Sequence, residues 1–414
     1  MSDLMPHNAT TNDANVLIVG ASVRGAAFSA LAAGFSPTAL DLFADEDLAN
    51  CCAARRVARY PGGLVTVARK LPESPWFYTG GLENHPRVVD AIARQRPLWG
   101  NTGDVLRRVR DPWHVAETLR AASIEVPRMR PASDPPPTDD AWLLKDYRSS
   151  GGLGVRPWNE STSLSKAPRG RWYFQQRIHG RNLAAVFLTA SGSARLLGVT
   201  EQFVGTLWCG ARPFAYAGSL GPLRLSARVA RQIECLGAAL AKEYSLRGLL
   251  GVDLVRDRQG RCWPLDINPR YPASAEVLEL AAGVSFVGYH AIACRTGELP
   301  AAQRAQPRRY AGKAIVYAPC ELIVSAAQNR RWHAANESHP LPTLARNKNR
   351  MPTYRVADIP AAGANIPMGA PVVTLIECGA DLANLRDMLR RRATALRRRL
   401  QRAADQEPSS LRTA

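Results

Sequence analysis

The stretch from Gly251 to Arg270, GVDLVRDRQGRCWPLDINPR, constrains the fold of this chain more than any other. Two runs rich in β-forming residues flank the polar turn Asp-Arg-Gln-Gly, which predicts an antiparallel hairpin. Side chains alternate along a strand, so Asp266 and Asn268 point to one face, and strand pairing can bring Asp253 beside them. Two carboxylates and an amide oxygen at one place predict a Mg²⁺ site.

Arg270 follows Asn268 by two residues on the same face, where a guanidinium can hold a phosphate or a carboxylate. The alternative interpretation of this stretch is a solvent-facing hairpin with ordinary polar side chains, because acidic residues are common on protein surfaces. The choice between the two depends on the rest of the chain.

Length and composition indicate a globular protein of two or three domains. The chain has 414 residues, of which 46% are apolar and 21% are charged. No apolar run approaches the roughly 20 residues that span a bilayer, and the polar N-terminus lacks a secretory signature. The cysteines show no metal-ligand spacing, so we expect reduced thiols in a cytoplasmic protein without a membrane partner.

The formal net charge of +19 comes mainly from arginine. Such a charge favours nucleic acid or an anionic ligand as a partner. No nucleic-acid-binding module is recognisable, so we expect a solvated basic helix face and not nucleic-acid binding. The arginines near the C-terminus that fall on this predicted helix are Arg386, Arg390, Arg391, Arg392, Arg397, Arg398, Arg399 and Arg402.

The N-terminal part of the chain predicts a doubly wound α/β domain. Val16–Gly20 is a continuous apolar strand, GASVRG forms a turn, Ala26–Ala33 is an alanine-rich helix, and Thr38–Leu42 is a second strand. GASVRG lacks the full G-x-G-x-x-G pattern, which argues against a dinucleotide site. Two further units are expected through Leu64–Ala68 and the segment WFYTGG.

A lysine followed by a glycine-rich loop predicts a phosphate-binding element. A short apolar strand delivers Lys145, and the loop follows almost at once. Glycines let the backbone approach a phosphate closely, and exposed N–H groups can cradle it. The element is not a Walker loop, because the lysine precedes the glycines; the alternative is a hairpin loop without a ligand. The loop residues are Ser149, Ser150, Gly151, Gly152 and Gly154.

The segment from Trp172 onwards predicts a strand, a short connection closed by Gly180, and a second apolar strand. Such a hinge could offer backbone groups of Gln175 and Gln176 to an adenine edge, with Ile178 packed on the ring. His179 in the same connection is expected to be a surface residue.

The order of these three elements resembles the ATP-grasp superfamily of carboxylate–amine ligases and carboxylases. The resemblance is strongest to its group of predicted ATP-dependent carboligases. The strand with GASVRG, the segment LDLFADEDL, the hinge, and DINPRYPASAEVLE carry it over most of residues 15–300. It implies an ATP-grasp fold, α/β (α+β), with an N-terminal doubly wound α/β domain and a small β-rich C-terminal extension.

The resemblance also implies roles for the elements. Lys145 would bind the nucleotide's phosphates, the glycine loop would close over them, and Arg270 would lie near the transferred phosphate. ATP and Mg²⁺ are the implied cofactors. The implied adenine contacts are Gln175, Gln176 and Ile178, and the implied magnesium ligands are Asp253, Asp266 and Asn268.

Three positions depart from the pattern of the superfamily. Asn182 stands where many relatives have a glutamate for the ribose, and Pro112 stands where many have an additional phosphate-binding lysine. Arg110 or a nearby arginine is a candidate to compensate for Pro112. Asp266 replaces a glutamate that is commoner at that metal position, and aspartate is still a competent magnesium ligand.

The implied domain order places the α/β domain at 15–103, after a disordered lead-in, 1–14. The ATP-grasp domain follows at 104–300, with a lid subdomain at about 140–200. The C-terminal extension with its basic helix is expected at 301–404, before a tail, 405–414.

The implied function is a ligase that joins a carboxylate to an amine through an acyl phosphate, releasing ADP and phosphate. Its partners would be small acidic carboxylates and amines, and one-carbon cofactor (methanopterin or methanofuran) biosynthesis is the suggested pathway. A homo-oligomer is compatible with the sequence. The alternatives are a biotin-type carboxylase that uses bicarbonate, although the Ile-Gln-Val-Glu-His run of that family is missing, and a non-catalytic binding protein of the same fold.

Residues outside these elements are candidates for substrate contacts. Arg24 and Asp41 lie at strand ends of the first domain, where open α/β sheets bind ligands. Glu276, Ser274 and Tyr271 follow the hairpin and could face the substrate or begin the next helix.

Overall fold

The parts of the chain that the structure describes are residues 14–162, 171–300, 309–337 and 355–406, in a computed structural model. The predicted lead-in before residue 14 and the predicted tail after residue 406 lie outside these ranges. Among the described residues no single helix has the length and apolar character needed to cross a membrane, although one pair bent by 109°, Ala275–Ala282 with Phe286–Thr296, passes that test together.

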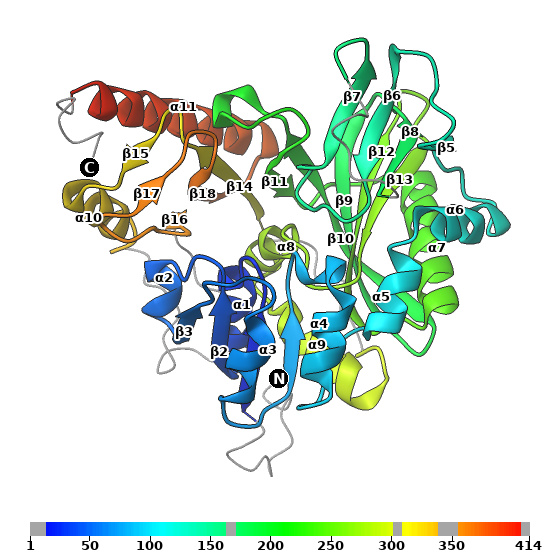
Figure 1. Cartoon of the computed structure of the whole chain (residues 1–414), viewed down its shortest axis with the longest axis horizontal. Helices are drawn as coiled ribbons and strands as arrows, with labels where there is room; N and C mark the ends of the chain where they lie inside the picture. The colour runs from blue at the N-terminus through cyan, green and yellow to red at the C-terminus, as the bar shows by residue number, and fades with distance from the viewer. Residues whose placement is uncertain (1–13, 163–170, 301–308, 338–354, 407–414) are drawn as a thin grey trace.

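The N-terminal domain is a four-stranded parallel sheet in the order β3-β2-β1-β4, drawn in blue in Figure 1. Both faces of β1 are buried, as predicted for a doubly wound sheet: Val16 and Ile18 pack on one face, and Leu17 and Val19 pack on the other. The elements are β1 (Asn15–Val19), α1 (Arg24–Ala32), β2 (Ser36–Asp41), α2 (Glu46–Ala49), β3 (Ala53–Arg56), α3 (Leu64–Arg69), β4 (Trp76–Tyr78), a 3-10 helix (Leu82–Asn84) and α4 (Pro86–Ala93).

One expected unit of this domain is placed differently. The expectation centred on Leu64–Ala68, which belongs to helix α3, and the strand at this point is β3. Leu64 and Ala68 are both buried, and their spacing of four residues puts them on one helix face. Strand β3 is an edge strand with the sequence AARR and no buried residue, so it carries no apolar signal.

A second four-stranded sheet, antiparallel, has the order β5-β8-β6-β7. It overlaps the first part of the lid subdomain expected at about 140–200 and is called the lid below. Trp142, Leu144, Trp158 and Phe174 form its small apolar core. Two short helices connect it to the N-terminal domain. The elements are α5 (Gly103–Val109), α6 (Pro112–Ala121), β5 (Met129–Pro131), β6 (Asp139–Asp146), β7 (Val155–Asn159) and β8 (Trp172–Gln176).

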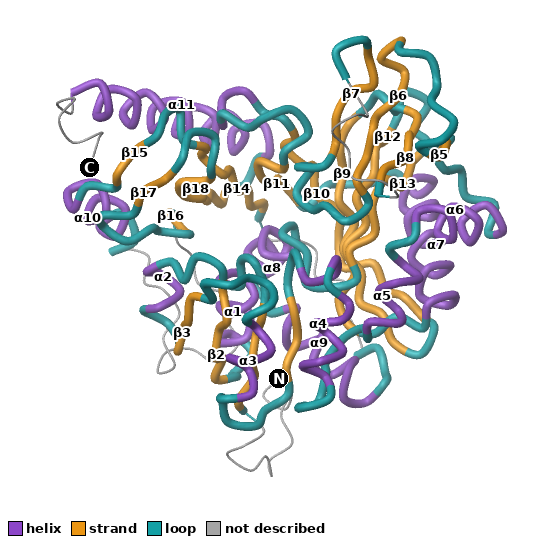
Figure 2. The backbone as a smooth tube through the Cα atoms, in the orientation of Figure 1, coloured by secondary structure: helices purple, strands orange, loops and turns teal. Residues whose placement is uncertain are grey.

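The central sheet has eight strands in the order β13-β12-β9-β10-β11-β14-β18-β16. The C-terminal strands β14, β18 and β16 therefore continue the sheet of the ATP-grasp region and do not form a sheet of their own (Figure 2). Helix α7 packs on this sheet through an apolar stripe. The elements are β9 (Arg181–Ala190), β10 (Ser193–Val204), a 3-10 helix (Leu207–Cys209), β11 (Tyr216–Gly221), α7 (Ala227–Tyr244), β12 (Gly248–Arg256), β13 (Cys262–Asn268), α8 (Ala275–Ala282), α9 (Phe286–Thr296), β14 (Tyr310–Tyr317), β16 (Val356–Ala357) and β18 (Pro371–Gly379).

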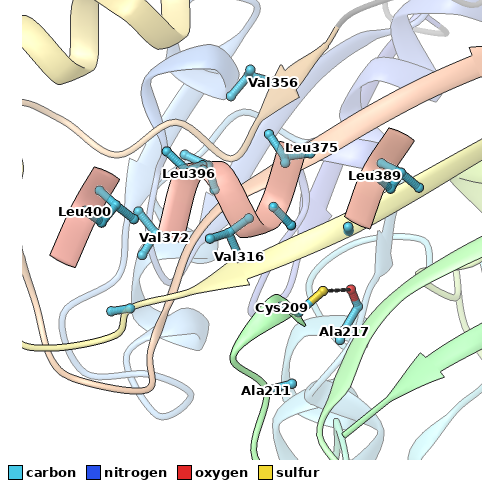
Figure 3. Packing of buried hydrophobic residues seen from close by; sticks show 14 of the residues in the cluster. Cys209, Ala211, Ala217, Val316, Val356, Val372, Leu375, Leu389, Leu396 and Leu400 are labelled. Carbon is cyan, nitrogen blue, oxygen red and sulfur yellow. Dashed lines mark hydrogen bonds between the residues drawn. The ribbon is translucent and has the colours of Figure 1, made fainter. Parts of the chain in front are cut away.

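Helix α11 (Leu382–Gln406) is the predicted basic helix, and it covers the C-terminal end of this sheet. Its buried residues recur every three or four positions, and Figure 3 shows Leu389, Leu396 and Leu400 along the helix in one cluster with Val316, Val372 and Leu375. Most of its arginines lie on the opposite, accessible face. The remaining elements of this region are β15 (Leu322–Ile323), α10 (Ala326–Ala334) and β17 (Asn365–Ile366).

A buried ion-pair cluster joins the N-terminal domain to the rest of the chain. Arg24 of α1 contacts Glu276 Oε1 of α8 at 2.5 Å and Asp358 Oδ1 at 2.7 Å. Lys313 Nζ of β14 contacts Glu276 Oε2 at 2.8 Å. Burial alone would raise the pKa of Glu276, and the two cations, Arg24 foremost, instead hold it well below its ordinary value. Glu276 therefore begins α8 as a buried carboxylate between two cations, the second of the two alternatives left open by the sequence.

Glu279, one turn further along α8, predicts a pH dependence of stability. Burial raises the pKa of Glu279 from 4.5 to about 7, although Ser29, Tyr271 and the Phe286 amide all donate to it. The folded state therefore keeps a proton that the unfolded state releases. This stabilisation is complete below pH 4.5 and is lost as the pH rises through about 7. We expect the melting temperature of the wild type to fall, relative to that of Glu279→Gln, as the pH rises from about 5 to about 8. A constant difference between the two proteins would contradict this assignment.

Candidate active site

The predicted hairpin forms, and its register brings the predicted metal ligands together. Asp253 lies directly opposite Asp266 in the β12–β13 pairing, and Gly251 lies opposite Asn268. Asn268 Nδ2 donates to Asp253 Oδ2 at 3.1 Å. Gln202, on β10, donates from Nε2 to Asp253 Oδ1 at 2.8 Å and was not foreseen from the sequence.

The electrostatics of this cluster fit a hard divalent cation. Burial, and then the neighbouring Asp266, raise the pKa of Asp253 to about 6. A bound cation would favour the ionised form of Asp253 and so lower this pKa. Its attraction for both carboxylates opposes the cost of burial and the repulsion between Asp253 and Asp266. The described residues contain no group of three or more His, Cys, Asp or Glu side chains suited to a metal. The donor set here is thus two carboxylates and the amide oxygen of Asn268, which already accepts from Arg270 Nη2 at 2.9 Å.

Lys145 connects the lid to the β12–β13 hairpin. Because this hairpin carries the predicted metal ligands, it is called the metal hairpin below. Lys145 lies on β6, and its Nζ donates to Gln175 Oε1 at 3.1 Å and to the Leu265 carbonyl at 3.0 Å. Leu265 precedes Asp266, so the ammonium is held beside the predicted metal ligands. The position agrees with a role on a phosphate that also binds the metal.

The predicted hinge comprises the end of β8, the start of β9 and the connection between them. Gln175, Gln176, Ile178 and Asn182 all line a cavity of about 600 Å³ that also holds the metal hairpin. The N–H of Gln176 and that of the next residue already donate to carbonyls of the lid. These two N–H groups are therefore not available to an adenine, so the adenine contacts inferred for the hinge would have to come from its other backbone groups and from Ile178.

The glycine loop is docked across the cavity onto the start of β11. Tyr216 N–H donates to the Gly151 carbonyl at 3.2 Å, and a Cβ built at Gly152 would lie 1.8 Å from the Phe214 carbonyl oxygen. Ser149 Oγ accepts from Gly154 N–H at 2.7 Å, so this hydroxyl shapes the loop itself. The cavity is lined by the predicted loop residues except Gly154.

The side chains of Arg270 and Arg110, which line the cavity, are hydrogen-bonded to other parts of the chain. Arg270 Nε and Nη2 donate to Glu83 Oε1 at 3.3 and 2.9 Å, and Nη1 donates to the Tyr271 carbonyl at 3.2 Å. Glu83 is 1% exposed and comes from the N-terminal domain. Burial alone would raise the pKa of Glu83, and Arg270 and Arg110 lower it below its ordinary value. Arg270 thus lines the cavity with most of its donors engaged, and sequence reasoning missed Glu83.

Arg110, the candidate to compensate for Pro112, lines the cavity. Its Nη1 donates to Asp266 Oδ1 at 2.6 Å and to the Ile267 carbonyl at 3.0 Å, inside the cavity. Pro112 is the first residue of α6, whose N-terminus is capped by Asp111. The sequence signal for Arg110 was its closeness to Pro112.

The comparisons with known proteins agree with the fold. Residues 109–274 match the family model of an ATP-grasp domain. These residues are therefore an ATP-grasp domain, and the chain has the ATP-grasp fold predicted from the order of its motifs. A search of curated protein sequences finds no match.

Solved structures similar to this one include three enzymes of known name. The biotin carboxylase domain of Hydrogenobacter thermophilus 2-oxoglutarate carboxylase, in complex with MgADP, ADP and bicarbonate, matches with a TM-score of 0.66, 14% identity, and coverage of 91% of this chain and 88% of that one. The L-amino acid ligase of Bacillus licheniformis matches with a TM-score of 0.66, 14% identity, and coverage of 92% and 97%. The N5-carboxyaminoimidazole ribonucleotide synthetase of Thermotoga maritima matches with a TM-score of 0.60, 13% identity, and coverage of 93% and 97%.

Alanine at two neighbouring glycines tests the docked position of the loop. Gly151 and Gly152 have φ angles of +63° and +78°, so alanine is strained at both by a similar amount. Only Gly152→Ala also clashes with the Phe214 carbonyl, whereas nothing lies within 4 Å of a Cβ at Gly151. We expect amide hydrogen exchange of residues 149–155 to be faster in Gly152→Ala than in Gly151→Ala. Equal exchange in the two variants would show that the loop does not dock in this way.

Proposed function

We propose that this chain is an ATP- and Mg²⁺-dependent ligase that joins a carboxylate to an amine through an acyl phosphate. The observation that carries the proposal is one cavity of about 600 Å³ that collects the hinge, Lys145, the glycine loop and the metal hairpin. The lid supplies one wall of the cavity, and the central sheet, with the hairpin at its edge, supplies another. Lys145 and Leu265 of the hairpin, which are in contact, lie 120 residues apart in sequence, and a surface hairpin without a ligand would not require them to meet.

The residues of the cavity suit binding and orientation more than covalent chemistry. Asp253 and Asp266 would hold Mg²⁺, which neutralises phosphate charge when bound, and Lys145 would bind the phosphates beside it. The docked glycine loop would exclude water from the transferred phosphoryl group. A substrate carboxylate oxygen would form the new bond to the γ-phosphorus as the bond to ADP breaks. The amine nitrogen would then form the amide bond, losing a proton as phosphate leaves.

Two other uses of the same cavity remain open to test. Bicarbonate could replace the organic carboxylate, and a biotin carboxylase domain with bound bicarbonate is among the structural neighbours. Phosphate release with bicarbonate, compared with release with amino acids, separates these reactions. Nucleotide binding without phosphate release in any pairing would favour the non-catalytic alternative, which Asn182 and Pro112 motivated.

The nature of the substrates is the finer part of the proposal. Acidic amino acids paired with small amines are the first combinations to screen for ADP and phosphate release. The one-carbon cofactor pathway rests on the resemblance alone, and the amine that supports the fastest release would test it.

A thermal-shift titration with MgATP tests the nucleotide and metal site. Ligand binding to the folded state raises the melting temperature, and a ligand at 100 times its dissociation constant contributes about 2.7 kcal/mol. We expect a Mg²⁺-dependent rise in the wild type that is largely lost in Asp266→Asn, which removes one ligand charge but keeps an acceptor for Arg110. Asp257→Asn is the control, because Asp257 lies in the turn of the same hairpin and bonds Arg261 and Trp263. Absence of any rise in the folded wild type would refute the proposed function.

A further inference from the structure

The side chain of Arg110 touches three parts of the chain that are far apart in sequence. Nη1 bonds the metal hairpin, at Asp266 and the next carbonyl, as described above. Nη2 lies 3.1 Å from Asn84 Oδ1 of the N-terminal domain. The same nitrogen lies 3.3 Å from the Tyr147 carbonyl and 3.2 Å from the Ser149 carbonyl, where the glycine loop begins.

This arrangement uses properties that only arginine has. The guanidinium is a rigid plane, so the bonds that Nη1 makes to Asp266 and the hairpin also fix the direction in which Nη2 donates. The Arg110 side chain is only 10% exposed. Charge-assisted hydrogen bonds in such an environment are stronger than the same bonds in water.

The glycines of the loop contribute no side-chain packing that would keep it closed. Gly151 and Gly152 have no side chains to pack, and their freedom makes ordering the loop costly in entropy. The tip of the loop is held by the bond from Tyr216 N–H to the Gly151 carbonyl. Its start is held by Arg110, through the Tyr147 and Ser149 carbonyls, and by a bond of 3.3 Å from Tyr147 N–H to the Arg171 carbonyl.

We propose that Arg110 is a positioning residue that latches the glycine loop closed over the metal hairpin. The anchors at Asp266 and Asn84 orient the guanidinium, and the guanidinium places the start of the loop. The N-terminal domain and the metal hairpin therefore determine together where the loop lies. The ligand-dependent part of the inference rests on the proposed nucleotide site, whereas the latch itself does not.

Amide hydrogen exchange of residues 147–155 in Arg110→Met, with the full chain and without nucleotide, tests the latch. We expect exchange at least about tenfold faster than in the wild type, because two charge-assisted bonds to the loop are lost. Arg110→Lys should give an intermediate rate, since one ammonium cannot replace the fork. Arg108→Met is the matched control: Arg108 lies on α5, two residues before Arg110, bonds the exposed Glu243 and lies over the Tyr244 ring, and its substitution should leave the rate unchanged.

The outcomes separate the latch from a purely structural role and from the proposed function. A folded Arg110→Met with unchanged exchange in the loop would overturn the latch, whatever its melting temperature. If this variant does not fold, Asn84→Ala takes its place, and it should still accelerate exchange several-fold because one anchor is lost; no acceleration would overturn the latch. Slower exchange with Mg²⁺ and a non-hydrolysable ATP analogue is expected in the wild type and should be weaker in Arg110→Met. If the analogue has no effect on the wild type but Arg110→Met still accelerates exchange, the latch stands and the nucleotide proposal fails.

Discussion

The pairing of Asp253 with Asp266 across the β12–β13 hairpin is the constraint on which the rest of the site depends. A shift of the register by one residue would turn one of these carboxylates to the other face of the sheet. The close approach of two partly buried carboxylates is unfavourable unless cations lie nearby. Arg110 supplies one such cation directly, on Asp266. The N-terminal domain, the lid and the hairpin must therefore be in place together for the acidic pair to be tolerated.

The local elements of the site could be predicted from the sequence because each leaves a local signal. The hairpin has a polar turn between β-forming runs, the loop has its glycines, and strand β1 is a continuous apolar run. The contacts that connect these elements leave no such signal. Glu83 meets Arg270 across 187 residues, and Gln202 meets Asp253 across 51 residues, so no spacing rule can find them. Strand β3 was missed for a related reason, since an exposed edge strand needs no apolar residues.

The arginine surplus has a use that the net charge did not reveal. Arg24 joins α1 to Glu276 and to Asp358, Arg270 joins the hairpin to Glu83, and Arg386 of α11 joins Glu201 of β10. In each case a planar, permanently charged group bonds an acceptor far away in sequence, which lysine would do less well. Much of the basic face of α11 is nevertheless solvated, as its apolar stripe requires.

These ion pairs weaken the argument for an acidic substrate. The sequence supported that idea through the excess of arginine over acidic residues. In the part of the chain that the structure describes, three arginines line the cavity: Arg110 is paired with Asp266, Arg270 is paired with Glu83, and Arg177 lies over the Phe214 ring. A cation whose charge is offset by a neighbouring carboxylate attracts an anion much less strongly than one without such a neighbour. The case for an anionic ligand therefore rests on Arg177, Lys145, the glycine loop and a metal on the hairpin, and the last three point to phosphates. The charge of the carboxylate substrate has to be decided by the substrate screen and not by the net charge of the chain.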